Sequence, residues 1–241
     1  MKPIGKRGTH VEMIISFSIF IIFLSSIFFI IEPSIKEKGD KEIVLNSLQR
    51  EILENISSNV TLTMIKIKDI YAPIESCIQF NEGGWALGEK VVVKNAADEI
   101  IASSFSYPSL KVDWVKKDKF LKIYSSLENL ETISLTSSNC ASPAETTDFS
   151  ISSIKAEEYV FESNIIELKS NYNSSYEDLK TYLDVSLEDE FGFTFVNSTG
   201  KISIDLGKKP ASRSIYSKEI PIIYMDNQSK IMAGIIRLNM W

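Results

Sequence analysis

The stretch Met13–Ile31, MIISFSIFIIFLSSIFFII, decides how this chain folds, because none of its 19 residues is charged. An α-helix of that length reaches roughly 28 Å, which matches the hydrocarbon core of a bilayer. Secretory signal peptides have a shorter apolar core and a small-residue cleavage site, and this run fits neither feature. Lys2, Lys6 and Arg7 all precede it, and the positive-inside rule keeps them in the cytoplasm. We therefore expect a single-pass helix in the cell membrane, with a cytoplasmic leader, 1–12, before it and the remaining chain outside.

The portion of the chain beyond the apolar run is acidic. The whole sequence has a net charge of −6, and the leader holds three basic residues and Glu12, which leaves 23 basic and 31 acidic residues in 32–241. A surface with a net charge of −8 does not attract nucleic acid or anionic lipid headgroups. We therefore expect no nucleic-acid partner.

The residue types of the outer portion exclude most catalytic designs. The only histidine, His10, precedes the apolar run, so the outer portion cannot form a Ser-His-Asp triad, a Cys-His pair or a His-ligated zinc site. Its acidic residues show no spacing that singles out a catalytic carboxylate pair, and its glycines form no phosphate-binding pattern. We expect a non-enzymatic protein with no cofactor and no metal.

The two cysteines, Cys77 and Cys140, both lie in the outer portion. A lone pair in an oxidising compartment favours a disulfide, which would close a loop of about 60 residues and stabilise the fold by about 4 kcal/mol. The alternative is two separate buried thiols, because sequence does not show whether the Cα atoms approach within about 7 Å. The outer portion also carries five N-x-[ST] sequons that permit surface glycosylation, at Asn55, Asn59, Asn173, Asn197 and Asn227.

A second helix is expected soon after the first. Pro33 and the charged stretch that follows it predict a kink or brief break, and Asp40 can cap the next helix. Apolar residues then recur three and four positions apart, at Leu45, Leu48, Ile52, Leu53 and Ile56. We assign the kink and an amphipathic helix to 32–59. The apolar stripe either packs on a sheet of the outer domain or continues the membrane helix as a stalk between neighbouring copies.

The remaining residues, 60–241, are predicted to form a mainly antiparallel, β-rich extracellular domain. Alternating or β-branched segments predict short strands at 60–67, 89–94, 130–136, 159–161 and 165–168. Turn residues between alternating segments predict two hairpins, 191–195 with 202–206 and 220–225 with 231–241. Helical spacing predicts one surface helix within 175–189. The fold class is therefore α+β, with a transmembrane helix that continues into an amphipathic helix ahead of the sheet.

The junction Lys6-Arg7-Gly8-Thr9-His10-Val11-Glu12 resembles the class III signal peptide of type IV pilins and of archaeal pilins and flagellins. In those families a prepilin-type peptidase cuts on the cytoplasmic side and leaves the apolar segment on the mature protein. The resemblance implies Lys6 and Arg7 as the basic residues of the leader, Gly8 as its last residue and Thr9 as the new N-terminus. Glu12 is fourth after that cut, and fifth if the peptidase cuts between Arg7 and Gly8.

Two classes of function follow. The resemblance implies a pilin-like or pseudopilin-like subunit, in which Glu12 neutralises the amine of a neighbouring subunit while the apolar helices pack into a filament or pseudopilus. Its partners would be the membrane, the prepilin-type peptidase and other pilin-like subunits. The alternative is an uncleaved, signal-anchored surface protein whose β-rich domain binds an extracellular ligand or a membrane partner. Removal of the leader distinguishes the two classes.

Overall fold

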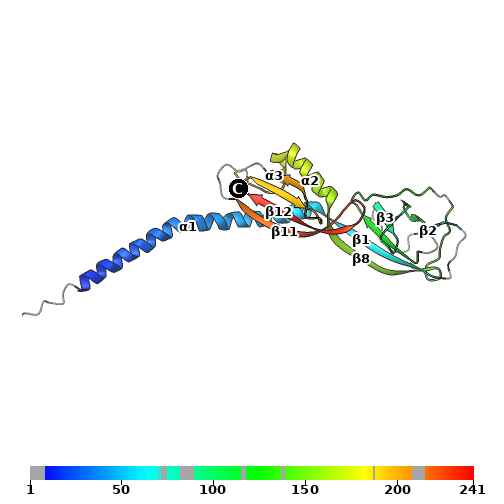
Figure 1. Ribbon diagram of the computed structural model, residues 1–241, viewed down its shortest axis with the longest axis horizontal. Helices are drawn as coiled ribbons and strands as arrows, with labels where there is room; N and C mark the ends of the chain where they lie inside the picture. The colour runs from blue at the N-terminus through cyan, green and yellow to red at the C-terminus, as the bar shows by residue number, and fades with distance from the viewer. Residues whose placement is uncertain are drawn as a thin grey trace, which may run out of the picture. The chain divides into compact units, whose positions relative to one another are not determined.

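The computed structural model describes residues 9–69, 71, 75–81, 90–114, 118–136, 139–186, 188–207 and 215–241 (Figure 1). Two compact units make up the chain, Met1–Ser47 and Leu48–Trp241. The first unit is helical where it is described, and the second is a domain in which strands predominate and two short helices are inserted. The predicted α+β class is confirmed at this level.

Helix α1 (Thr9–Ile56) is continuous over 48 residues. The long apolar helix is therefore confirmed, whereas the predicted brief break after Ile31 is wrong. The physical reason is that Pro33 removes only one backbone donor from the ladder. The turns before and after it keep their own hydrogen bonds, so the backbone stays helical through this segment.

The last turns of α1 belong to the second unit and are amphipathic, as predicted. Leu48, Ile52 and Ile56 are buried within that unit, while Arg50 and Glu54 are exposed. Four-residue spacing places the three buried side chains on one face of the helix. This part of the predicted apolar stripe therefore packs into the β-rich domain.

The main sheet of the domain has nine strands. Their order is β10 (Ile202–Leu206), β9 (Phe191–Val196), β12 (Ile231–Met240), β11 (Tyr216–Met225), β8 (Phe149–Phe161), β1 (Ser57–Ile67), β7 (Phe120–Ser126), β3 (Lys90–Lys94) and β4 (Ile100–Ile101). All neighbours in this order are antiparallel except β8 and β11, which are parallel and meet at only two residue pairs. Figure 1 shows the long strands β1 and β8 running side by side.

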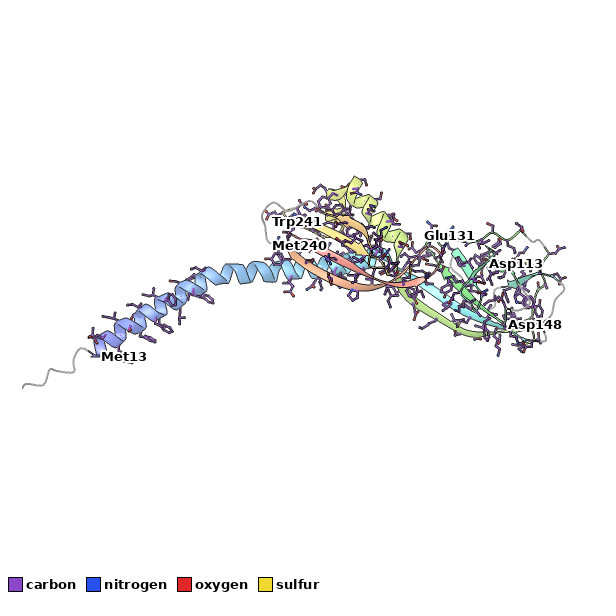
Figure 2. All side chains as sticks on the ribbon, viewed as in Figure 1. Met13, Asp113, Glu131, Asp148, Met240 and Trp241 are labelled. Carbon is purple, nitrogen blue, oxygen red and sulfur yellow. A yellow bond between two sulfur atoms is a disulfide. The ribbon has the colours of Figure 1, made fainter. Side chains whose placement is uncertain are left out.

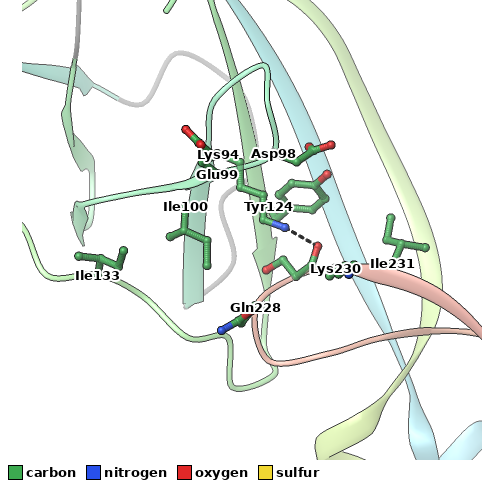
Figure 3. Close-up of a pocket in the computed structure, with 10 residues that line it drawn as sticks. Lys94, Asp98, Glu99, Ile100, Tyr124, Ile133, Gln228, Lys230 and Ile231 are labelled. Carbon is green, nitrogen blue, oxygen red and sulfur yellow. Dashed lines mark hydrogen bonds between the residues drawn. The ribbon is translucent and has the colours of Figure 1, made fainter. Parts of the chain in front are cut away.

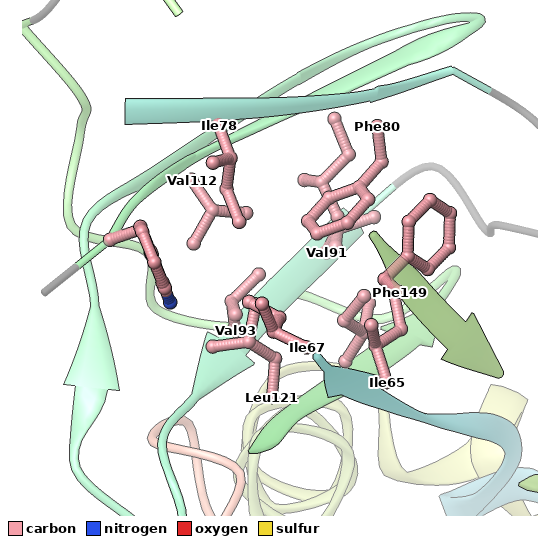
Figure 4. Packing of buried hydrophobic residues seen from close by; sticks show 12 residues of the cluster. Ile65, Ile67, Ile78, Phe80, Val91, Val93, Val112, Leu121 and Phe149 are labelled. Atoms are coloured by element: carbon pink, nitrogen blue, oxygen red, sulfur yellow. The ribbon is translucent and has the colours of Figure 1, made fainter. Parts of the chain in front are cut away.

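A second sheet packs against part of the first. It contains β2 (Cys77–Asn81), β6 (Ser109–Asp113) and β5 (Ser103–Ser106), all antiparallel. The apolar side chains between the sheets form one cluster, shown in Figure 4, to which β1, β3 and β7 contribute from one side and β2 and β6 from the other. Phe80 and Phe149 meet edge to face there, with ring centroids 5.1 Å apart.

Both predicted hairpins are confirmed. Residues 191–196 pair with 202–206, and 216–225 pair with 231–240. The alternating aromatic residues Phe191, Phe193 and Phe195 are buried, as are Ile236, Leu238 and Met240 on β12. The predicted surface helix is also present, as the shorter α3 (Tyr176–Tyr182).

Two predicted strands are wrong. Residues 165–168 lie in helix α2 (Glu162–Ser174), where Ile165, Leu168 and Tyr172 share a buried face at helical spacing. A short apolar run does not by itself distinguish a strand from a buried helical segment. Residues 130–136 form no ladder, because Glu131 N donates to Asn227 O while Ile133 O accepts from Ser103 N in a different part of the domain.

Cys77 and Cys140 form a disulfide, with their Cα atoms 4.5 Å apart. Cys77 is buried at the start of β2. The backbone beside the bond is paired as well, because Ala141 N donates to Cys77 O at 2.9 Å and Gln79 N donates to Ala141 O at 2.8 Å. The covalent link and these hydrogen bonds together hold the segment around residue 140 against the second sheet.

Replacing both cysteines by serine should lower the free energy of unfolding by about 4 kcal/mol, because the closed loop spans 63 residues. Chemical denaturation of the wild type and the Cys77→Ser/Cys140→Ser variant measures the difference. Wild-type protein treated with a thiol reductant is the matched control and should behave like the variant. Equal stability of oxidised and reduced wild type would contradict this account.

Candidate functional site

The first half of α1 is an exposed apolar surface. The segment Val11–Ile30 is long and apolar enough to cross a membrane, and none of it is buried within the chain. A signal sequence near the N-terminus can also meet this criterion of length and composition. Figure 2 shows the side chains from Met13 onward projecting from the helix on both sides. Such a surface has to be covered by lipid or by other protein.

Two of the four serines within this apolar segment donate hydrogen bonds to their own helix. Ser18 Oγ donates to Ile14 O at 2.9 Å, and Ser26 Oγ donates to Ile22 O at 2.8 Å. These bonds run to the preceding turn, where hydroxyl groups are satisfied without water. These two serines therefore do not oppose burial of the segment in an apolar environment.

The residues assigned to processing lie at the start of α1. Lys6, Arg7 and Gly8 fall outside the described residues, and Thr9 is the first residue of the helix. Glu12 is an exposed acidic residue in the first turn. A carboxylate near a helix N-terminus is favoured by the helix dipole. The structure thus places Glu12 directly before the uncharged run Met13–Ile31, where its side chain is exposed to an external partner.

A cavity of about 690 Å³ lies in the β-rich domain and was not predicted (Figure 3). It is open on one side, and four separate parts of the domain form it: the end of β3 with the loop that follows, the middle of β7, the segment around Ile133, and the turn between β11 and β12. Its lining residues are Lys94, Asp98, Glu99, Ile100, Tyr124, Ile133, Gln228, Ser229, Lys230 and Ile231.

Lys94 is the most unusual residue of this cavity, because its side chain is charged and only 4% exposed. Its Nζ donates to Ser229 O at 2.7 Å and lies 5.2 Å from the centroid of the Tyr124 ring. Burial lowers the pKa of Lys94, and the Asp98 and Asp226 carboxylates oppose that shift. An ammonium group has three N–H donors, and the bond to Ser229 O uses one of them. Lys94 Nζ can therefore donate to a further acceptor.

Ser229 adds a second buried polar group beside Lys94. It is 1% exposed, and its Oγ is buried without a hydrogen-bond partner. Its φ of 57° lies in the left-handed region, which residues other than glycine seldom adopt. The acidic residues of the cavity already have partners, since Asp98 Oδ1 accepts from Lys122 Nζ at 2.6 Å and Glu99 Oε2 accepts from Asn95 Nδ2 at 2.9 Å.

The buried wall of the cavity therefore offers hydrogen-bond donors that are not fully used. A ligand group that accepts hydrogen bonds would satisfy the Lys94 ammonium and the Ser229 hydroxyl. Within the described ranges, no three His, Cys, Asp or Glu side chains are placed to hold a metal ion.

A second buried lysine serves the fold instead. Lys180 is 1% exposed, with its Nζ 3.6 Å from Glu190 Oε1 and 5.7 Å from the centroid of the Tyr176 ring. Nearby, Tyr172 Oη donates to Phe191 O at 2.7 Å, and burial raises the pKa of Tyr176. These contacts attach α2 and α3 to the start of β9 and leave Lys180 enclosed.

Comparison with known proteins gives no relative. The chain matches no protein-family model, no curated protein and no solved structure.

Lys94 should make the stability of the domain depend on pH in a defined direction. Its lowered pKa means that, between that pKa and the ordinary value of 10.5, the unfolded chain binds more protons than the folded chain. The free energy of unfolding therefore rises with pH across that window. Lys94→Met removes this contribution, so stability should rise less as the pH increases toward 10.5 in the variant than in the wild type.

Denaturant unfolding at several pH values measures these slopes. Lys201→Met, at an exposed turn position, is the matched control and should keep the wild-type slope. Equal slopes for the wild type and Lys94→Met would show that burial of Lys94 does not penalise its charge.

Proposed function

We propose that this chain is a non-enzymatic, membrane-anchored subunit of pilin-like type that assembles through the N-terminal half of α1 and carries its β-rich domain outside the cell. One observation supports the proposal above the others. A single uninterrupted helix begins with an apolar segment of which no residue is buried and ends with apolar residues that the domain buries.

The exposed segment has to be covered from outside the chain. Each buried Leu, Ile or Phe gains roughly 1.5 to 3 kcal/mol over the exposed state, and this segment contains many such residues. Lipid can cover them, and so can the same segment of neighbouring copies. A pilin-like subunit would use both environments in turn, the bilayer before assembly and packed helices afterwards.

Processing at Gly8 would make that transfer possible. The three basic residues that hold the helix end in the cytoplasm all precede the cut. Removal of the leader would therefore leave only the new amine and Glu12 at that end. Glu12, exposed in the first turn, would then neutralise the amine of a neighbouring subunit. Such a pair strengthens as water is excluded around the packed helices.

Several features of the domain support its placement outside the cell. Its two cysteines form a disulfide, which persists in oxidising compartments. All five sequons lie beyond the apolar segment, and the net charge of that portion is negative, as suits a surface that avoids anionic lipid.

The N-terminal sequence and intact mass of the protein from its native membrane test the processing step. We expect a new terminus at Thr9 or Gly8. Replacing Gly8 by Trp should block a cut after Gly8, because the residue before a prepilin cleavage site has to be small, and the protein should then keep its leader. Identical mature masses for the wild type and Gly8→Trp would refute the proposal.

The Glu12→Ala variant tests assembly separately from processing. It should be cleaved normally but should assemble roughly a hundredfold more weakly, because loss of one partner of a desolvated ion pair costs about 3 kcal/mol. Glu42→Ala, which removes an exposed glutamate from the same helix, is the matched control and should assemble like the wild type. Chemical cross-linking of subunits in the membrane measures assembly, and normal cross-linking of Glu12→Ala would rule out the charge-pairing role.

The cavity around Lys94 favours a second candidate function. An uncleaved, single-pass protein would present this cavity to an extracellular ligand that accepts hydrogen bonds. An N-terminus at Met1 or Lys2 in the native membrane would support this candidate over the pilin-like one.

A further inference from the structure

Strand β8 lies inside the nine-strand order, yet most of one edge of it has no partner strand among the described residues. On one side it pairs with β1 along nearly its whole length. On the other side it meets β11 only through Val160 and Phe161. Figure 1 shows β8 at the margin of its part of the sheet, with β1 beside it.

The regular part of this free edge has defined ends. The register between β1 and β8 shifts where Met64 faces Ser153 and Ile65 faces Ile151, so Ser152 is an extra residue that interrupts the ladder. The pairing with β11 begins at Val160. Between these two points lies the seven-residue segment Ser153–Tyr159, which we call the free edge of β8.

The free edge is open to solvent. Five of its residues are exposed and the other two, Glu157 and Tyr159, are half-buried. It contains no proline, unlike the neighbouring free part of β11, where Pro221 cannot donate to a ladder. An edge of this kind presents a row of backbone donors and acceptors for another strand.

Antiparallel pairing restricts the registers that two copies of this edge can form. Along a strand, every second residue directs its N–H and C=O groups toward a given edge. Two residues that pair across two copies must both do so or both not do so, so their residue numbers differ by an even number. The register that uses the whole free edge has Ala156 at its centre. It places Ser153 opposite Tyr159 and Lys155 opposite Glu157.

Charge favours the same register. Lys155 and Glu157 already form an ion pair on one face of β8. With Ala156 at the centre, Lys155 of each copy also faces Glu157 of the other, which joins two ion pairs into a group of four alternating charges. A shift of the centre to residue 155 or 157 opposes two lysines or two glutamates, and like charges directly opposite are destabilising.

We propose that two copies of this chain pair through the free edge of β8, as antiparallel strands related by a two-fold axis at Ala156. The contact is self-complementary, so the same seven residues on each copy form it. It uses a different part of the chain from the assembly through α1 and needs no cleavage of the leader.

Charge reversal tests the partner and the register together. In full-length protein in detergent, Lys155→Glu and Glu157→Lys should each weaken dimerisation by about tenfold, because attractive pairs become repulsive ones. An equimolar mixture of the two variants should regain the wild-type dimer, since the two acidic side chains of one variant would face the two lysines of the other. Analytical ultracentrifugation measures the dimer fraction.

A mixture that stays as weakly dimeric as its components would overturn the proposal, as would single variants that dimerise like the wild type. A misfolded variant could not restore the dimer in the mixture, so restoration excludes a folding artefact. Glu12→Ala leaves this edge unchanged, so failure of assembly through α1 and failure of the β8 contact are measured independently.

Engineered cysteines give a second readout of the register. Because the native pair is already bonded, Ala156→Cys adds one free thiol at the two-fold axis, and mild oxidation should give a disulfide-linked dimer. Ser153→Cys is the matched control, because its two thiols would lie roughly 20 Å apart, six residues along the ladder, and should not link. Equal linking at both positions would indicate random collision, and linking of Ala156→Cys only to a different protein would show another occupant; either result refutes the proposed pair.

Discussion

The apolar half of α1 is not covered by its own chain, and its side chains require an apolar environment from outside the molecule. The segment Val11–Ile30 has no buried residue, and in the membrane-anchored protein that we propose it is covered by a bilayer or by other helices. In the topology that we propose, that requirement puts the disulfide and the acidic domain on the far side of the membrane from the basic leader. It also makes the first turn, with Glu12, the position where a single charge has the greatest effect on leaving the bilayer.

Sequence patterns predicted the fold where one surface of an element is buried and the other is not. The alternating residues Phe191, Phe193 and Phe195 identified their hairpin because burial follows the two-residue period of a strand. The same reasoning failed for Ile165 and Leu168, whose short apolar run fits a helix as well as a strand. At Pro33 the sequence predicted a kink or a brief break, and of these two the break is wrong because the helix is continuous there.

The cavity was beyond prediction for a different reason. Lys94 closes the sequence KVVVK, in which a final lysine suggests a strand end in water, and Ser229 lies in an ordinary polar turn. These two residues are 135 positions apart, and only the folded domain brings the ammonium to the Ser229 carbonyl. Glu12 and Gly8, by contrast, were proposed from a local motif, because a peptidase that removed the leader would recognise neighbouring residues and not tertiary contacts.

Strand β8 shows what an apolar pattern cannot report. Its residues from Ser152 to Ala156 are all exposed, so neither surface of the strand carries an alternating apolar signal, and only its last residues were predicted. A segment that lies in lipid needs apolar side chains at nearly every position, so it is recognised in the sequence as an apolar run. A partner strand binds the backbone, which every residue shares, and leaves only a charge pattern such as Lys155 with Glu157. We propose two contacts between copies of this protein, one through α1 and one through the free edge of β8. The apolar pattern of the sequence predicts the first and not the second.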